Sequence, residues 1–171
     1  MKSFSKSNAD IVFTSGTSGE PKGVVVPEQS YLHTTKVLID IFKQSKKHSE
    51  LLSMPFSHSF GLARLRCSLF SGSSAVITNG LRNTPKIYSF ILNGKINSLS
   101  MVPSALKVFK GTLRKSVRNI AGKIKYIEIG SSFLDEDLNN WLLNNFKSTI
   151  IYHHYGMTEA SRSFFRCRSV L

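Results

Sequence analysis

The segment FTSGTSGEPKGV, at residues 13–24, combines residue types that suit the binding of an anion. Its glycines permit backbone conformations with positive φ, so successive N–H groups can converge on a negatively charged group. Four hydroxyl side chains add donors and a lysine adds a full positive charge, which together predict a polyphosphate-binding loop. A plain surface loop would not need so many donors after a strand. The predicted contacts are Thr14, Ser15, Gly16, Thr17, Ser18, Gly19 and Lys22.

The spacing of this loop differs from two common phosphate-binding patterns. In a Walker loop a lysine follows a glycine directly and a Ser or Thr comes next, whereas Lys22 stands between Pro21 and Gly23. The dinucleotide fingerprint G-x-G-x-x-G does not fit the segment either. The sequence therefore indicates a phosphate site of another kind.

A second segment, YHHYGMTEAS at residues 152–161, offers groups for the other parts of a nucleotide. Tyr155 can present a ring face to a base, and Gly156 lets the backbone approach it. Thr158 can donate to a phosphate oxygen, and Glu159 can bind a cation such as Mg²⁺ through oxygen. Taken alone, the segment could equally be a turn between a strand and a helix.

Short apolar runs alternate with helical patterns along the chain. Strands are predicted at 11–14, 24–26, 51–56, 74–78, 96–102, 125–130 and 148–154, the last of them being STIIYHH. Helices are predicted from Pro27, over 62–70, over 84–92, from Ser104 and after the capping residue Asp135. The basic segment 114–125 is expected to be an exposed connection.

This alternation predicts an α/β fold, with a mostly parallel sheet and helices on both faces. No repeat, low-complexity tract or linker divides the chain, so residues 1–171 are expected to form a single domain. In such folds, ligands bind at the carboxyl ends of the strands. Both chemically unusual segments follow predicted strands, which favours a shared site.

The charge balance is uneven. The chain has 23 Lys and Arg against 10 Asp and Glu, a formal net charge of +13, and no acidic residue lies between Glu50 and Glu128. Three interpretations are open: an anionic partner, a solvated basic face, or a face covered by other protein. A specific nucleic-acid-binding module is disfavoured, because the aromatic residues fall mainly on apolar stripes rather than between basic residues.

Other functional classes lack their sequence patterns. No apolar run approaches the roughly 20 residues of a membrane span, and no signal peptide is evident, so a cytoplasmic protein is expected. Cys67 and Cys167 lack the paired spacing of a zinc or redox motif. A hydrolase is disfavoured because there is no G-x-S-x-G motif and His153 and His154 have no partners at metal-ligand spacing.

Four segments in order resemble motifs of the AMP-forming adenylate enzymes, the superfamily of acyl-CoA synthetases, luciferases and the adenylation domains of peptide synthetases. FTSGTSGEPKGV resembles the phosphate loop YTSGTTGxPKGV, and YGMTE resembles the later YGxTE motif. Between them, MPFSHSFGL resembles the PxxHxxG segment, and IGSSFLDEDL resembles the strand and turn usually written GGAPL. The resemblance covers about residues 8–162.

The resemblance implies a reaction in which a carboxylate attacks the α-phosphorus of ATP, expels pyrophosphate and forms an acyl-adenylate, which a thiol such as coenzyme A intercepts. Residues 14–19 and Lys22 would then hold the β- and γ-phosphates, Thr158 would contact the α-phosphate, and Glu159 would bind Mg²⁺. His58 would lie beside the incoming carboxylate. The remaining nucleotide contacts implied are Gly130, Ser131, Ser132, Tyr155, Gly156 and Met157, with the first four bordering the adenine.

The sequence departs from these motifs in two ways. Ser131-Ser132-Phe133 replaces the usual Gly-Ala-Pro and adds bulk beside the implied base. No STGD-like motif is present, nor the C-terminal domain with its catalytic lysine. We therefore expect part of a larger enzyme, a split-gene product that meets a partner, or a remnant, unable to form a thioester alone. A catalytically silent nucleotide-binding or interaction fragment is the alternative.

Overall fold

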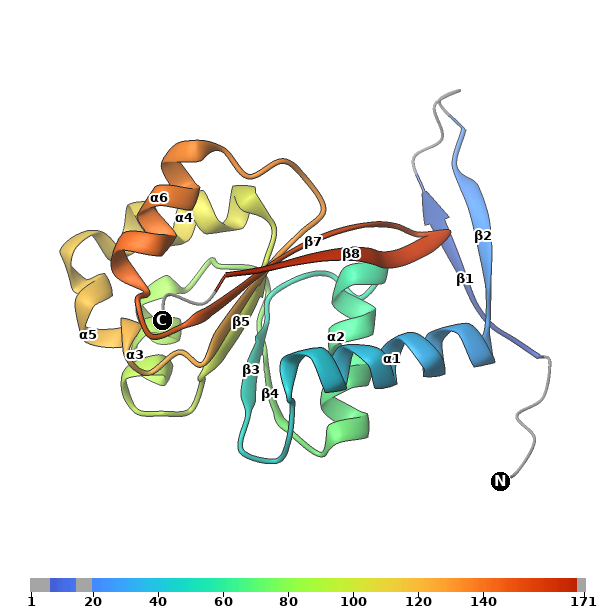
Figure 1. Ribbon diagram of the computed structural model, residues 1–171, viewed down its shortest axis with the longest axis horizontal. Coiled ribbons are helices and arrows are strands. Elements are labelled where there is room, and N and C mark those ends of the chain that lie inside the picture. Colours follow the sequence, from blue (N-terminus) through green and yellow to red (C-terminus); the bar gives the residue numbers. More distant parts are fainter. Residues whose placement is uncertain (1–6, 15–19, 169–171) are drawn as a thin grey trace.

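The computed structural model describes residues 7–14 and 20–168, and only the backbone of 161–163 and 168 (Figure 1). The main sheet has the strand order β4-β3-β5-β6-β7-β8. All neighbouring strands are parallel except β7 and β8, which are antiparallel. The strands are β3 (Ser49–Leu52), β4 (Ser74–Ile77), β5 (Ser98–Met101), β6 (Tyr126–Ile129), β7 (Ile150–Met157) and β8 (Ala160–Arg168).

Helices cover both faces of this sheet, as the sequence predicts (Figure 1). On one face, α1 and α2 pack over the strands; on the other lie α3 to α6. Side chains alternate along β6, so Ile127 and Ile129 face the second helical layer while Tyr126 and Glu128 face the first. The helices are α1 (Glu28–Phe42), α2 (Ser59–Ser71), α3 (Thr84–Leu92), α4 (Pro103–Leu113), α5 (Val117–Ala121) and α6 (Glu136–Asn145).

Local sequence signals account for several helix boundaries. The side chain of Asp135 accepts a hydrogen bond from the backbone N–H of Leu138 at 2.8 Å, which confirms the predicted cap of α6. Helix α3 has the predicted bounds, and the side chain of Asn83 caps it. Pro27 directly precedes α1, where its missing N–H has no cost.

The first two strands do not join the main sheet. Strands β1 (Asn8–Thr14) and β2 (Lys22–Pro27) pair antiparallel in a separate hairpin, which stands beside α1 in Figure 1. The connection between them is too short for the crossover that parallel strands require. Residues Ser15, Gly16, Thr17, Ser18 and Gly19 of the predicted phosphate loop lie outside the described residues.

The prediction of an exposed connection at 114–125 is wrong. This segment contains a short 3₁₀ helix (Arg114–Ser116) and α5, and the side chains of Val117, Ile120 and Ile124 are buried. Val117 and Ile120 are three residues apart and lie on one face of α5, and Ile124 follows the turn after the helix. The basic residues between these side chains conceal the pattern in the sequence.

The prediction that STIIYHH is the last strand is also wrong. Strand β7 runs on to Met157 and turns through Thr158 and Glu159 into β8, so YGMTE forms the end of a hairpin rather than a strand-to-helix turn. In β8, Phe165 packs edge-on against Phe42, while Phe164 is exposed. The two faces of β8 thus show the alternation of a strand with one covered side.

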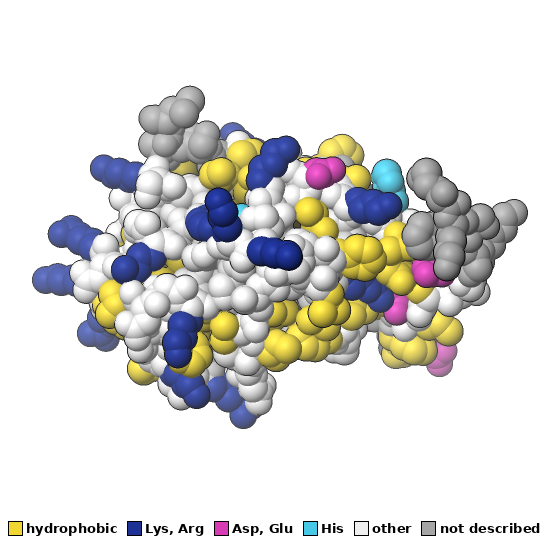
Figure 2. All heavy atoms as spheres, turned by 90° about the horizontal axis from the view of Figure 1, so that it is seen from below, with side chains coloured by type: hydrophobic (Ala, Val, Ile, Leu, Met, Phe, Trp, Pro, Cys, Tyr) yellow, Lys and Arg dark blue, Asp and Glu magenta, His cyan; other side chains and the backbone are white. Residues whose placement is uncertain are grey.

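Basic side chains gather where the chain enters the parallel strands. The exposed lysines of this amino edge are Lys46 and Lys47 before β3, Lys95 before β5, and Lys123 and Lys125 before β6. On the face shown in Figure 2, Lys and Arg side chains are spread across the surface and few Asp or Glu side chains reach it. No helix among the described residues is both long and apolar enough to cross a membrane.

Candidate functional site

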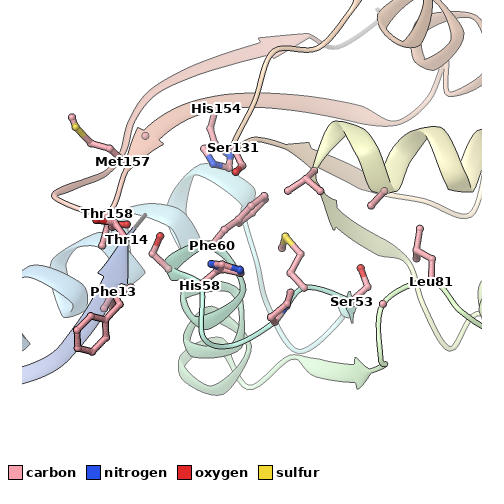
Figure 3. Close-up of a pocket in the computed structure, with 18 residues that line it drawn as sticks. Phe13, Thr14, Ser53, His58, Phe60, Leu81, Ser131, His154, Met157 and Thr158 are labelled. Carbon is pink, nitrogen blue, oxygen red and sulfur yellow. The ribbon is translucent and has the colours of Figure 1, made fainter. Parts of the chain in front are cut away.

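A cavity of about 590 Å³ opens at the carboxyl ends of the parallel strands (Figure 3). Its walls come from the loops after β3, β4, β5 and β6, the end of β1, and the tip of the β7–β8 hairpin. This is the edge at which an open α/β sheet binds ligands. Of the residues predicted for the site, it brings together Thr14, His58, Ser131, Gly156, Met157 and Thr158.

His58 is placed by the loop between β3 and α2. Helix α2 begins at Ser59 rather than at the predicted Leu62, so His58 is its N-cap residue, and the exposed side chain lines the cavity. The backbone N–H of His58 donates to the carbonyl of Pro55 at 3.2 Å. A Cβ atom on Gly61 would lie 2.4 Å from that carbonyl oxygen, so only glycine lets the loop fold onto the helix. The positive end of the α2 dipole therefore lies beside the imidazole, which favours an anionic group there.

Thr14 lies at the end of β1, opposite Lys22 on β2. Its hydroxyl donates to the carbonyl oxygen of Lys22 at 3.5 Å, a long contact that ties the two ends of the predicted phosphate loop. The side chain of Lys22 is exposed and does not line the cavity.

His154 lines the cavity as well, although its position in the sequence does not predict this role. Its ring is buried, lies edge-on against Phe60 at a centroid distance of 4.6 Å, and lines the cavity beside Ser131 (Figure 3). A Cβ on Gly130 would be 1.9 Å from Cε1 of this ring, so the predicted contact Gly130 is needed to seat His154. Side chains alternate along a strand, and this alternation is the signal that could have placed His154 on the inner face of β7.

Glu159 does not line the same cavity as His58. It is exposed and lines a second cavity of about 360 Å³, between the β1–β2 hairpin, α1 and α2. Thr158 lines both cavities. Among the described residues no three His, Cys, Asp or Glu side chains cluster as a metal site. One carboxylate completed by phosphate oxygens is nevertheless the usual way in which proteins hold Mg²⁺.

A third cavity, of about 470 Å³, lies on the other side of the β7–β8 hairpin end. It brings Tyr155 together with Ser131 and Ser132, three of the residues expected to border the adenine. Tyr155 and Phe133 are exposed and line it, offering aromatic surface for a planar base. Ser131, His154 and Gly156 line both this cavity and the first, so the two adjoin.

A buried polar network lies behind the cavity wall, between the sheet and α2. Arg64 is fully buried and donates to both carboxylate oxygens of Glu50, at 2.7 and 2.6 Å. The guanidinium also donates to Gln44 at 2.9 Å, and its Nε lies 3.4 Å from Glu128. The second Glu128 oxygen is 3.0 Å from Nδ1 of His154, without hydrogen-bond geometry.

Electrostatics fix the charge of this network. Burial alone would lower the pKa of the Arg64 guanidinium, but the attraction of Glu50, and then of Glu128, raises the pKa well above its usual value. Burial, reinforced by the charge of Glu50, raises the pKa of the Tyr126 hydroxyl. Arg64 is therefore a permanent cation and Tyr126 a neutral donor, so the network holds its arrangement at physiological pH.

Comparison with known sequences adds an independent finding. Residues 4–169 match the sequence family described as AMP-binding enzyme. The chain is 28% identical over 154 residues to the D-alanine–D-alanyl carrier protein ligase of Staphylococcus aureus (strain Newman), which is 88% of this chain and 31% of that protein. It is 26% identical over 164 residues to the polyketide synthase PksN of Bacillus subtilis (strain 168), 93% of this chain and 3% of that protein.

Solved structures share the fold. The apo structure of MatB from Rhodopseudomonas palustris has a TM-score of 0.85 at 20% identity, over 97% of this chain and 32% of that one. The o-succinylbenzoate coenzyme A synthetase MenE from Bacillus subtilis in complex with AMP has a TM-score of 0.79 at 21% identity, over 94% of this chain and 32% of that one. The present chain thus spans about a third of the ligases that it matches.

Proposed function

Because this chain belongs to the family of AMP-binding enzymes, we propose that it binds ATP and a carboxylic acid for the formation of an acyl-adenylate. A carboxylate oxygen would attack the α-phosphorus, the bond from that phosphorus to the bridging oxygen would break, and pyrophosphate would leave. The observation that supports this most strongly is the convergence of Thr14, His58, Ser131 and Thr158 on one cavity. These residues come from four segments that are far apart in the sequence, and no local backbone structure brings them together.

We assign roles along one extended ligand. The third cavity takes the adenine against Tyr155, and the adjoining first cavity takes the α-phosphate near Thr158 and the carboxylate near His58. Lys22 and the predicted loop at 14–19 would neutralise the β- and γ-phosphates, and Glu159 would supply a carboxylate for Mg²⁺. In reactions of this kind, most of the rate comes from positioning and charge neutralisation.

The acyl group then passes to a thiol. A curated relative is named as a carrier-protein ligase, and a solved neighbour holds a coenzyme A product analogue. We infer for this chain the same class of acceptor, either coenzyme A or a carrier-protein thiol.

The test is calorimetric titration with Mg²⁺ and ATP. Thr158→Val removes one hydroxyl at the join of the cavities and is expected to weaken ATP binding about tenfold, the loss of one charge-assisted hydrogen bond. The control Thr112→Val removes an exposed hydroxyl that bonds only within α4, to the carbonyl of Val108, and should leave the affinity unchanged. Equal ATP affinity in both variants would contradict the proposal, and binding without acid-dependent pyrophosphate exchange would favour the silent nucleotide-binding alternative.

A further inference from the structure

The first cavity has two threonine hydroxyl groups at one end, beside Phe13 and Met157. Thr14 and Thr158 lie at one end in Figure 3, where the phosphate is proposed to bind, and Ser53 and Leu81 lie at the opposite end. The end marked by Ser53 and Leu81 is called the far end. The segments after β3, β4 and β5 line the cavity, and among the residues that they contribute are four with apolar side chains: Met54, Leu81, Val102 and Ala105.

No formally charged side chain lines this cavity among the described residues. Its 18 lining residues include neither Asp, Glu, Lys nor Arg. The segment 15–19, whose placement is not described, holds only Ser, Thr and Gly. The cavity thus has no fixed charge with which to pair a charged group on the acyl chain.

The acidic groups on the strands that lead into the cavity wall are already engaged. Glu50 and Glu128 belong to strands that lead into this wall, but both are fully buried. Arg64 and the Ser100 hydroxyl bond to the Glu50 carboxylate, and the Ser100 hydroxyl also lies 3.1 Å from Glu128. Neither carboxylate is available to a substrate ammonium group.

The two histidines that line the cavity do not supply a counter-charge at its far end. His154 is buried against Phe60 and turns Nδ1 toward Glu128, and His58 stands at the α2 N-terminus, where the reacting carboxylate is proposed to bind. In Figure 3 both histidines lie apart from Ser53 and Leu81, between the two ends of the cavity. A charge carried there would lose its hydration without gaining a partner.

Resting on the proposed function, we propose that this cavity takes a monocarboxylic acid with an uncharged, mainly apolar acyl chain. Acids with a terminal ammonium group or a second carboxylate are excluded from the far end. The cavity distinguishes these acids because it lacks a counter-charge, and not because of their size. Acids with the same number of chain carbons should therefore bind with different affinities when their terminal charges differ.

The experiment uses three stable analogues of the acyl-adenylate, in which an acyl sulfamate replaces the acyl phosphate of the adenylate. The acyl groups are butanoyl, 4-aminobutanoyl and succinyl, which share a four-carbon chain and differ in the terminal charge. Calorimetry on the full chain measures the three affinities beside that of AMP. We expect the butanoyl analogue to bind at least tenfold more tightly than either charged analogue.

The outcomes separate this inference from the proposed function. If AMP binds and a charged analogue equals or exceeds the butanoyl analogue, the inference is overturned and the nucleotide site stands. If neither AMP nor any analogue binds, the proposed function fails and the inference falls with it.

A variant pair tests the cause directly. Leu81 is only partly buried, so a polar replacement can be tolerated there. Leu81→Asp supplies the missing carboxylate and should shift the preference toward the 4-aminobutanoyl analogue by at least tenfold relative to the butanoyl analogue. Leu81→Asn has nearly the same shape without the charge and should not produce this shift. An equal shift in both variants would show that polarity or space, rather than charge, sets the selection.

Discussion

Replacement of Arg64 by methionine is expected to be strongly destabilising. Arg64 is the fully buried cation of the network and pairs with Glu50 at 2.6 Å and Glu128 at 3.4 Å. Methionine fills much of the same volume but leaves two buried carboxylates without a counter-charge. Breaking a buried pair in this way costs about 3–5 kcal/mol of the free energy of unfolding.

Urea denaturation followed through Trp141, the single tryptophan, provides the assay. The control is Lys110→Met, which removes an ion pair with the exposed Asp137 and should cost less than about 1 kcal/mol. Adding Glu128→Gln to Arg64→Met should recover part of the loss, because it neutralises one of the two buried carboxylates that Arg64 no longer faces. Equal stability of Arg64→Met and Lys110→Met would refute the claim that the network depends on its cation.

Three further outcomes are expected. Gly130→Ala would force a Cβ into the His154 ring and should cost about 1–3 kcal/mol in denaturation, a loss that His154→Ala in the same chain should relieve. A hydrogen bond from Lys107, and then one from the Leu138 N–H, lower the pKa of Asp135. The stability that its charge contributes is therefore present near neutral pH and is lost as the pH falls below about 4. The Asp135→Asn variant should unfold at a lower temperature than the unchanged protein near neutral pH, and this difference should shrink in acid. A difference that stays constant with pH would contradict the prediction. The exposed lysines of the amino edge should give weak, sequence-independent binding to single-stranded DNA that falls steeply with salt in fluorescence anisotropy, whereas tight, sequence-selective binding would favour a nucleic-acid module.

Where the signal was local, the sequence predicted the fold well. Strands β3, β5 and β6 were predicted from their short apolar runs, and all three are almost wholly buried. Asp135 and Pro27 marked helix starts through their own backbone chemistry. Helix α5 was missed because a basic residue, Arg118, stands between its buried side chains Val117 and Ile120.

The candidate site was predicted in part. Three of its predicted members, Thr14, His58 and Thr158, do meet. The loop after β3 opens at the carboxyl edge of the sheet, and the β1–β2 hairpin and the turn between β7 and β8 reach the same cavity. His154 and its link through Glu128 to Arg64 depend on contacts across three strands and a helix, which no local pattern records. The residues of YGMTE line three different cavities because the segment forms the turn of a hairpin. The spacing of apolar residues in the sequence did not reveal this turn.

The most direct test of the nucleotide site is photolabelling with 8-azido-ATP, followed by mapping of the modified peptide. The assignment of adenine to the third cavity predicts that the label attaches within residues 131–133 or 153–166, that excess ATP with Mg²⁺ prevents it, and that Tyr155→Ala reduces it. Label confined to the basic amino edge, at residues 43–48 or 122–125, or label that ATP does not displace, would contradict the account.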